Sequence, residues 1–412
     1  MQFSIDRDRL VETMQAQAEI GGTDGGGLNR VALSDADKSV RDWFLKQMEA
    51  AGLETRIDEF GNMFGRREGT DPSAGAILIG SHLDSQAYGG IYDGCLGVVA
   101  ALETVRTLND EEIETQHPIE IVNWTNEEGA RFDSVTQGSG VWAGQLDIEE
   151  EYQKTDSEGK SVESELERIG YKGNTAAKPI KKYDSGIELH IEQGTRLEQN
   201  NADVGVVTGV AGLTWGAATF HGTADHSGTT QMSNRNDAFV AAADTVVAIR
   251  RLAGKLGNET VGTVGRVETS PNSINVVPGE AEITWDLRDP DDNIVETGYE
   301  QIIAEANAAA EREGIEVTCR EQSRSKSVDF DDRLIEAIEM TTTEAGYDSL
   351  RVFSGATHDA INVAKVCDAG MIFAVSEGGR SHTESEYTSW DDCYSAANTL
   401  ANVTTLLATE EA

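Results

Sequence analysis

Short apolar runs alternate with a helical hydrophobic pattern through the first half of the chain. Apolar side chains recur at helical spacing from Val40 to Ala51, after Ser34 and Asp37, whose types and spacing fit an N-terminal capping box. A second helical pattern covers 97–108. Continuous apolar runs, which predict buried strands, lie at 76–81, 119–125, 187–191 and 204–210. Strands separated by helices predict an α/β sheet with helices on both faces.

The pattern changes near Leu213, where a second set of elements begins. The predicted strands of this set are 213–224, 263–270, 282–289 and 315–319, and its predicted helices are 237–256 and 293–313. Beyond Ser325 the order returns to helix, strand and helix. Because one core of 412 residues would be unusual, we predict two domains. The catalytic domain is formed by 1–212 and 327–412, and a smaller α/β domain, 213–326, is inserted between them.

The charge balance limits the possible partners. Acidic residues outnumber lysine and arginine by 73 to 33, which gives a formal net charge of −40 spread along the chain. Such a field repels nucleic acid and anionic membrane surfaces, so we expect neither as a partner. Solvated carboxylates keep proteins soluble in concentrated salt, which screens their mutual repulsion. The excess therefore favours a halophilic origin.

Cysteine spacing and hydropathy indicate a cytoplasmic protein. The cysteines Cys95, Cys319, Cys367 and Cys393 are widely separated, with neither a disulfide framework nor a cysteine zinc site in their spacing. The first ten residues carry acidic side chains and no apolar core segment, so they do not resemble a signal peptide. No run reaches the ~18–20 apolar residues of a membrane span.

Histidines and acids gather where predicted strands end. His82, Asp84 and Asp93 lie in the stretch GSHLDSQAYGGIYDG, directly after the strand at 76–81. In open α/β sheets, ligands bind outside the carboxyl ends of the strands. The remaining strand ends contribute Glu127, Glu128, His190 and His382. Each residue alone is better explained as structural, because single histidines and single acids after strands are common.

Together these residues predict a site for two divalent metal ions. Imidazole and carboxylate groups suit zinc, and also manganese, cobalt or nickel. Asp93 can bridge ions about 3.5–4 Å apart. His82 and His190 would complete the first site, and Glu128 and His382 the second.

Two further acids lie beside this predicted set. Neighbouring residues in an extended chain point in opposite directions, so Glu127 and Glu128 should have different tasks. One can bind metal while the other takes a proton from water. Asp84 is placed to accept the second ring proton of His82.

The chain resembles the amidase/hydantoinase/carbamoylase family of di-metal amidohydrolases over nearly its whole length. The likeness is carried by ordered motifs: GGLNRVALSDAD, GSHLDSQAYGGIYDG, NEEGARF, GSGVWAG, ELHIEQG, DHSGTTQMSNRNDA, NSINVVPG, DLRDP, SGATHDA and GGRSHTESE. The resemblance implies an aminopeptidase-like catalytic domain of mixed sheet and an inserted domain that serves as lid and dimerisation domain. It also implies the metal ligands named above, with Glu127 as general base.

The resemblance implies substrate contacts as well. His226 would reach into the partner subunit's active site and stabilise the oxyanion, and Arg288 would clamp a substrate carboxylate with two hydrogen bonds. Asn275 and Gln193 would also contact the substrate. Thr357 in SGATHDA, a further substrate-side position, replaces a glycine common in the family.

The expected function is metal-dependent hydrolysis of a linear C–N amide bond in a small carboxylated substrate. N-Carbamoyl-L-amino acids are the leading substrates, and allantoate, β-ureidopropionate, or the substrates of a dipeptidase or aminoacylase are the alternatives. The alternative from another class is a metal-bound binding module that has lost catalysis. Such a module would not need Glu127, the expected general base, beside a complete set of metal ligands. Two departures from the family pattern leave the identity of the substrate undetermined: Gln231 replaces a usual proline, and SHTESE replaces the commoner SHNPxE.

Overall fold

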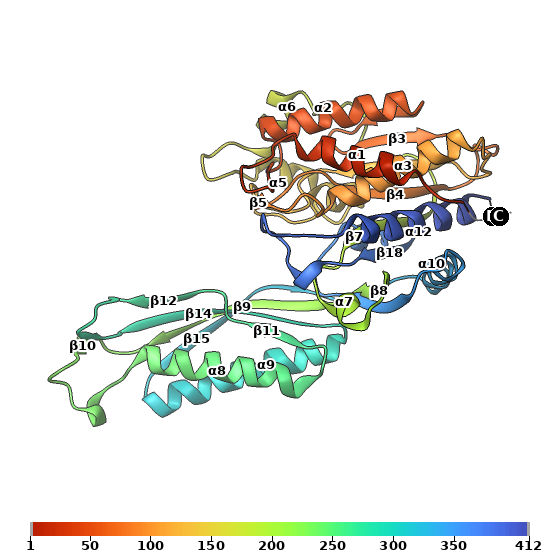
Figure 1. Cartoon of the computed structure of the whole chain (residues 1–412). Coiled ribbons are helices and arrows are strands. Elements are labelled where there is room, and N and C mark those ends of the chain that lie inside the picture. Colours follow the sequence, from red (N-terminus) through yellow and green to blue (C-terminus); the bar gives the residue numbers. More distant parts are fainter. Residues whose placement is uncertain (1–2, 410–412) are drawn as a thin grey trace. The chain divides into compact units, whose positions relative to one another are not determined.

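The computed structural model describes residues 3–409 and divides the chain into two compact units. Unit 1 comprises Met1–Gly209 and Asp329–Ala412, and unit 2 comprises Val210–Val328. Each unit has its own sheet and its own covering helices (Figure 1). None of the helices between residues 3 and 409 has the length and apolar character needed to cross a membrane.

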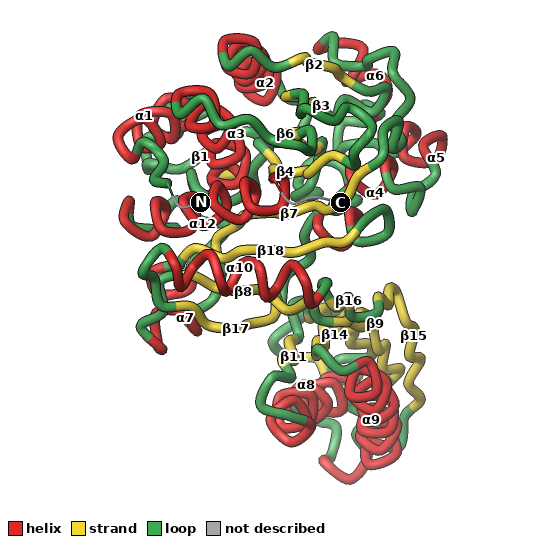
Figure 2. Tube along the Cα trace, turned by 90° about the vertical axis from the view of Figure 1, so that its right-hand side faces the viewer, coloured by secondary structure: helices red, strands yellow, loops and turns green. Residues whose placement is uncertain are grey.

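Unit 1 is built on a nine-stranded mixed sheet in the order β16-β8-β18-β7-β4-β6-β3-β2, with β17 also paired to β8. Its strands are β2 (Glu54–Ile57), β3 (Met63–Arg67), β4 (Ala76–His82), β6 (Ile119–Trp124), β7 (Tyr183–Ile191), β8 (Val204–Val210), β16 (Val328–Asp329), β17 (Ser349–Ser354) and β18 (Asp368–Ala374). Strands β6, β4, β7 and β18 run parallel, so their carboxyl ends meet at one edge. Figure 2 shows β18 between β7 and β8, although it follows them in sequence by the whole of unit 2.

Helices cover this sheet on both faces. The helices of unit 1 are α1 (Arg7–Ala18), α2 (Asp35–Ala50), α3 (Cys95–Asp110), α4 (Gln137–Trp142), α5 (Ile148–Gln153), α6 (Val162–Ile169), α7 (Arg196–Asn200), α10 (Asp332–Glu344), α11 (Ala360–Val363) and α12 (Trp390–Thr409). Helix α3 approaches the side of β4 that carries Ser81 so closely that a Cβ at Gly97 would lie 2.8 Å from the Ser81 Cβ and 2.1 Å from the Leu189 carbonyl oxygen. Side chains alternate along a strand, so α11, which meets Leu78 and Gly80, lies on the other face.

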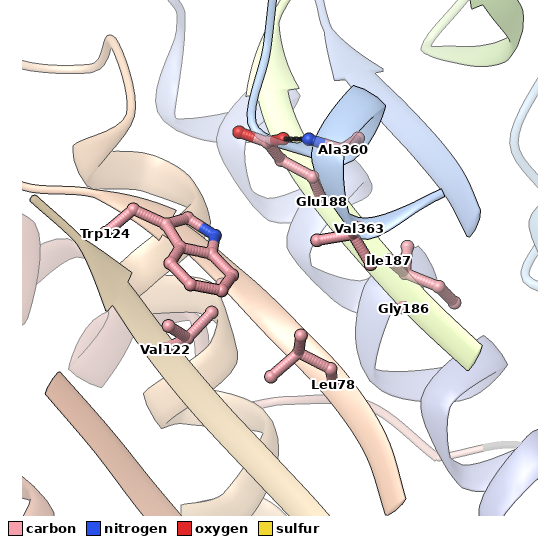
Figure 3. Close-up of a pocket in the computed structure, with 9 residues that line it drawn as sticks. Leu78, Val122, Trp124, Gly186, Ile187, Glu188, Ala360 and Val363 are labelled. Atoms are coloured by element: carbon pink, nitrogen blue, oxygen red, sulfur yellow. Dashed lines mark hydrogen bonds between the residues drawn. The ribbon is translucent and has the colours of Figure 1, made fainter. Parts of the chain in front are cut away.

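A buried carboxylate fastens α11 to the sheet. Glu188 of β7 accepts a hydrogen bond from the Ala360 main-chain nitrogen at 2.8 Å and another from the Ser81 hydroxyl at 2.7 Å. Leu78, Val122, Trp124 and Val363 enclose a cavity of about 10 Å³ beside it (Figure 3). The cavity has room for about one water molecule, so the contact between α11 and the sheet is closely packed.

Unit 2 is an antiparallel sheet with two long helices packed against it. The sheet runs β11-β14-β9-β15, with β12 also on β14, and a separate pair joins β10 to β13. Its elements are β9 (Gly212–His221), β10 (Asp225–His226), α8 (Ala238–Leu256), β11 (Val261–Thr263), β12 (Val267–Ser270), β13 (Val276–Val277), β14 (Glu280–Asp289), α9 (Asp292–Glu313) and β15 (Glu316–Ser325). Strand β14 alternates strictly, with Ala281, Ile283, Trp285 and Leu287 buried in the core that the helices close.

Two short paired strands and two single 3-10 turns complete the structure. In unit 1, β1 (Leu28–Asn29) pairs antiparallel with β5 (Ala87–Gly89), and η2 (Glu377–Gly379) precedes His382. In unit 2, η1 (Met232–Asn234) follows β10. The β1–β5 pair positions the loop that leads from β4 toward Asp93.

Candidate active site

The predicted metal ligands of unit 1 meet at the carboxyl ends of its parallel strands. His82 is the last residue of β4, His190 lies near the end of β7, and Asp93 precedes α3. Glu128 follows β6, and His382 follows β18. Their ligand atoms form two clusters, each with atoms within 4.8 Å of one another: His82–Asp93–His190 and Asp93–Glu128–His382.

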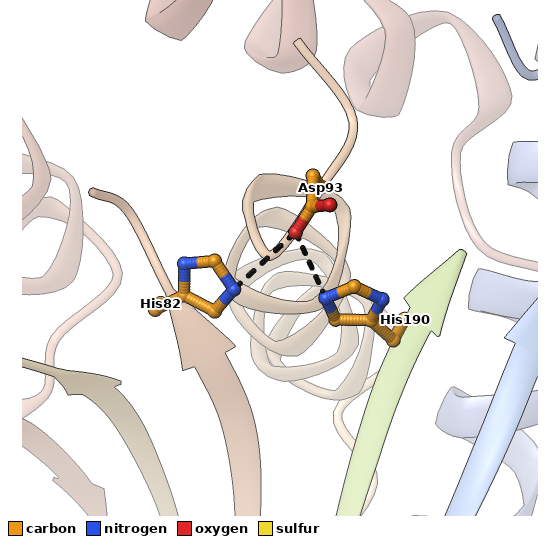
Figure 4. A group of neighbouring side chains, drawn as sticks. All are labelled: His82, Asp93 and His190. Carbon is orange, nitrogen blue, oxygen red and sulfur yellow. Dashed lines mark ion pairs between the residues drawn. The ribbon is translucent and has the colours of Figure 1, made fainter. Parts of the chain in front are cut away.

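Both histidines of the first cluster turn the Nε2 atom of the ring toward Asp93. The Nε2 atom of His190 lies 3.0 Å from Asp93 Oδ1, and that of His82 lies 3.5 Å from the same oxygen (Figure 4). The Nδ1 atoms lie 3.0 Å from the main-chain carbonyl oxygens of Asp84 and Ile191, to which they donate. These hydrogen bonds fix the tautomer, so both Nε2 lone pairs face the carboxylate.

The second cluster uses the other oxygen of Asp93. The His382 Nε2 atom lies 3.7 Å from Asp93 Oδ2 and 3.3 Å from Glu128 Oε2. Gln86 donates from its Nε2 to Glu128 Oε2 at 2.9 Å, which orients that carboxylate. Asp93 therefore presents one oxygen to each cluster, the arrangement that a bridging ligand requires.

The donor set fits divalent cations. The His82 Nε2 atom is buried without a hydrogen-bond partner, although carboxylates of Asp93 and Glu127 lie 3.5 Å from it. Burial, with repulsion from Asp93, raises the pKa of Glu128 to about 8, and burial holds the pKa of Glu127 well above its usual range. A cation among these groups would reverse both shifts, because it favours the ionised carboxylates.

Glu127 lies at the edge of the first cluster and belongs to neither set of three. Its Oε2 atom is 3.5 Å from His82 Nε2. The prediction that Glu127 and Glu128 point apart because they lie in an extended strand is wrong. Strand β6 ends at Trp124, and Asn126 has a φ of 53°. A turn, and not strand alternation, directs the two side chains to different places.

Asp84 acts differently from the prediction. The His82 ring proton goes to the main-chain oxygen of Asp84, and the Asp84 carboxylate is 3.8 Å from the ring. That carboxylate instead accepts the main-chain N–H groups of Glu127 and Glu128, each at 3.3 Å. A two-residue spacing from the histidine could not distinguish carbonyl from carboxylate as the acceptor. Asp84 thus orients the loop that carries both glutamates.

Two predicted substrate contacts lie in unit 1. Gln193 donates from its Nε2 to Asp93 Oδ2 at 2.7 Å, so its amide borders the second cluster. Thr357 is half-buried in the loop between β17 and α11. It precedes His358, whose ring lies 4.5 Å from the His190 ring, centroid to centroid.

The other predicted substrate contacts lie in unit 2, at opposite ends of its sheet. His226 pairs with Val276, and the Ser227 nitrogen donates to the Asn275 carbonyl at 3.0 Å, so His226 and Asn275 share one exposed tip beyond Glu280. Arg288 is near the far end of β14, where it binds both oxygens of Asp286. At about 3.3 Å per residue, these ends are roughly 25 Å apart. One small molecule cannot touch both ends of the same unit.

Glu386 and Ser381 also contact Asp93, although the sequence pattern did not predict a role for either residue. The hydroxyl of Ser381 lies 2.7 Å from Asp93 Oδ2, and the buried carboxylate of Glu386 accepts the Asp93 main-chain N–H at 3.1 Å. Burial, with repulsion from Asp93, raises the pKa of Glu386 to about 7. The one sequence feature that points to Ser381 and Glu386 is that both lie within four residues of the predicted metal ligand His382.

Comparison with known proteins identifies the fold and the chemistry. The family described as Peptidase family M20/M25/M40 matches residues 78–405. The chain belongs to this family. The N-carbamoyl-L-amino-acid amidohydrolase of Rhizobium meliloti is 42% identical to this M20 chain over 382 residues, covering 93% of the chain and 92% of the relative. The N-carbamoyl-L-amino acid amidohydrolase of Geobacillus stearothermophilus is 37% identical, covering 99% of the chain and 100% of the relative.

A solved structure agrees with these sequence matches. The crystal structure of an amidase of the hydantoinase/carbamoylase family from Burkholderia multivorans has a TM-score of 0.95 and 37% identity to this M20 chain, and covers 99% of each chain. The predicted family resemblance and the predicted mixed-sheet α/β fold are therefore confirmed. This M20 chain is a hydrolase.

Proposed function

We propose that the protein hydrolyses N-carbamoyl-L-amino acids at two divalent metal ions, with zinc as the first candidate. The observation that carries this proposal is the pair of clusters sharing Asp93, with Glu127 beside them. The names of the relatives at 42% and 37% identity support the substrate class. The nitrogen and oxygen donors support zinc and equally admit manganese, cobalt or nickel.

The chain's own residues account for the proton transfers. The bound ions would supply Lewis-acid polarisation of the carbamoyl carbonyl and lower the pKa of the attacking water. His82 and His190 would hold the first ion, Glu128 and His382 the second, and Asp93 both. Glu127 takes a proton from the water as its oxygen bonds to the carbamoyl carbon, and returns it to the amine nitrogen as the C–N bond breaks. The released carbamate then decomposes to CO2 and ammonia.

We propose that the complete site needs two subunits. Arg288 clamps the substrate carboxylate, His226 stabilises the developing oxyanion, and Asn275 contacts the substrate, as the family resemblance implies. Because Arg288 is roughly 25 Å along one sheet from the tip that carries His226 and Asn275, at about 3.3 Å per residue, we assign Arg288 and that tip to different chains of a homodimer. The exposed tip that carries His226 also carries Ile274 and Met232, whose exposed fractions of 103% and 77% favour burial against another protein surface. Unit 2 would thus serve as lid and dimerisation domain.

Two further properties follow from composition. We propose a cytoplasmic location, since Cys95, Cys319, Cys367 and Cys393 are all free thiols. We also propose a halophilic source, because 73 acidic residues face 33 basic ones.

The test is ammonia release from a substrate panel. Purified protein in molar salt is loaded separately with Zn²⁺, Mn²⁺, Co²⁺ or Ni²⁺. Ammonia release is measured with N-carbamoyl-L-amino acids, allantoate and β-ureidopropionate. Dipeptides and N-acyl amino acids complete the panel, and their hydrolysis is measured by amine release. We expect the highest kcat/KM for an N-carbamoyl-L-amino acid. A higher value for any other member would reassign the substrate, and turnover undiminished by chelators would rule out the metal mechanism.

A further inference from the structure

The carboxylate of Glu386 holds the residue that joins both metal clusters. Its Oε1 atom accepts the main-chain N–H groups of Tyr92 and Asp93, each at 3.1 Å. Its Oε2 atom lies 3.0 Å from the Ser381 hydroxyl, which lies 2.7 Å from Asp93 Oδ2. Glu386 therefore fixes the Asp93 main chain directly, while the Ser381 hydroxyl lies between the two carboxylates and donates its one proton to either of them.

The same contacts hold the least buried of the metal ligands. The side chain of His382 is 49% exposed, whereas that of Glu128 is 4% exposed. The main chain of His382 has a φ of 57°, in the left-handed region that a non-glycine residue occupies only when its surroundings hold it there. Since little packing surrounds the His382 ring, its distance from Asp93 depends on how the segment 381–386 is anchored.

The fold reserves space for this anchor. A Cβ atom at Gly90 would lie 2.0 Å from Glu386 Oε1, so a side chain at Gly90 would displace the carboxylate from the Tyr92 and Asp93 amides. The first cluster shares Asp93 but depends less on this anchor, because its other two members, His82 and His190, come from buried strands and are 0% and 1% exposed.

We propose that Glu386 is a positioning residue that sets the affinity of the second metal site, Asp93–Glu128–His382, and leaves the first site nearly unchanged. The inference rests on the two-metal site of the proposed function. Removing groups that orient metal ligands commonly weakens metal binding by about 10–100-fold. If Glu386 only stabilised the fold, its removal would change the metal affinity of both sites equally, or of neither.

The test is calorimetric titration of Zn²⁺ into the metal-free, full-length protein. Wild type should bind two ions per chain. Glu386→Ala should keep one ion at wild-type affinity and bind the second about 10–100-fold more weakly. Glu386→Gln should recover most of that loss, because the amide oxygen still accepts both main-chain N–H groups.

The matched control is Glu192→Ala. Glu192 also follows a metal ligand and accepts two main-chain N–H groups, those of Arg196 and Leu197 at 2.7 and 3.0 Å. Its described contacts do not reach Asp93, so this variant should bind both ions as wild type does. Equal losses in Glu192→Ala and Glu386→Ala would show a general loss of order and overturn the inference.

Other outcomes separate the inference from the function on which it rests. Two ions at wild-type affinity in Glu386→Ala would overturn the inference alone, whereas a wild type that binds fewer than two ions would overturn the proposed metal site. If Glu386→Ala does not fold, Gly90→Ala decides, because its Cβ would lie 2.0 Å from Glu386 Oε1 and would displace the carboxylate from the Tyr92 and Asp93 amides. An unchanged second affinity in that variant would contradict the positioning role.

Discussion

At the scale of single residues, adjacent side chains do different work because a turn separates them. Glu127 and Glu128 share the Asp84 carboxylate as acceptor for their main-chain N–H groups, yet their carboxylates face His82 and His382 respectively. Both are buried, so both resist ionisation until a cation is near. Under the proposed function, the pair would join metal binding to proton transfer within two consecutive residues.

The Glu127→Gln variant separates these two tasks. It should bind two Zn²⁺ ions as wild type does, and lose at least about 100-fold in kcat, the low end of a general base's contribution. Metal analysis and ammonia release measure the two properties on one sample. Glu128→Gln is the counterpart, which should lose the second ion. Activity of Glu127→Gln within tenfold of wild type would reverse the assignment of base and ligand.

Arg288→Lys should raise KM about tenfold or more for carboxylated substrates. The guanidinium already binds both oxygens of Asp286, and a lysine ammonium cannot hold Asp286 and a substrate carboxylate in the same planar geometry. Steady-state kinetics with an N-carbamoyl amino acid give the measurement. Arg266→Lys, in the same unit but paired with Glu282, should leave KM unchanged. An unchanged KM in Arg288→Lys would mean that this side chain does not face the substrate.

At the scale of elements, the closeness of α3 to the sheet fixes the start of that helix, and Asp93 lies just before it. The contact depends on Gly97, because a Cβ there would lie 2.1 Å from a main-chain oxygen of β7. A main-chain atom of a central strand cannot move aside as the end of a flexible side chain can. The position of α3 and the position of Asp93, the proposed bridging ligand, are therefore coupled.

Gly97→Ala should lower the free energy of unfolding by about 1–3 kcal/mol, as overpacking does, and weaken Zn²⁺ binding. The control is Gly254→Ala in α8, where no atom lies within 4 Å of the added Cβ. That change should raise the free energy of unfolding by about 0.4–1 kcal/mol, because alanine restricts the unfolded chain. Urea denaturation measures both variants. Equal stability of Gly97→Ala and wild type would show that α3 can shift freely.

Many of the helices and strands could be predicted from the sequence, because local patterns encode local structure. Ser34 accepts a hydrogen bond from the Asp37 nitrogen at the start of α2, as the capping pattern predicted, and the apolar runs became β4, β6, β7 and β8. The strand order could not be read, since β18 pairs with strands far away in the chain. The contacts of Glu386 could not be predicted for the same reason, because its partners Tyr92 and Asp93 lie almost 300 residues earlier in the chain.

At the scale of the whole molecule, the dominant property is a net charge of −40. Many exposed carboxylates have no basic partner to offset them, since acids outnumber bases by more than two to one. Their mutual repulsion opposes folding and association, and dissolved ions screen it over about 10 Å at 0.1 M salt.

The melting temperature should therefore fall as salt decreases from molar to ~0.1 M. Differential scanning fluorimetry across a KCl series gives the measurement, and size-exclusion chromatography follows the proposed dimer. Sucrose at matched osmolality serves as control, because it does not screen charge and should not restore the low-salt loss fully. A flat melting temperature across the series would count against a halophilic source.

Subunit complementation tests the two-chain site. His226→Ala and Glu127→Gln chains, each inactive alone, should recover about half of wild-type activity per heterodimer, because one of its two sites would combine both intact residues. Heterodimers are formed by mixing differently tagged chains and purified on both tags. Mixed homodimers that have not exchanged chains are the control. Heterodimers without activity would place His226 outside the partner's site.

A ribosome releases β7 and β8 well before β18, the strand that separates them in the finished sheet. At about 5–20 residues per second, synthesis of the intervening chain takes about 10–30 s. During this interval the newly made β7 and β8 have no β18 to pair with, and exposed strand edges invite association with other chains. The nascent polypeptide already contains His82, Asp93 and His190 but not His382, so metal acquisition during translation could begin only at the first cluster. The order of synthesis thus favours filling the first cluster before the second.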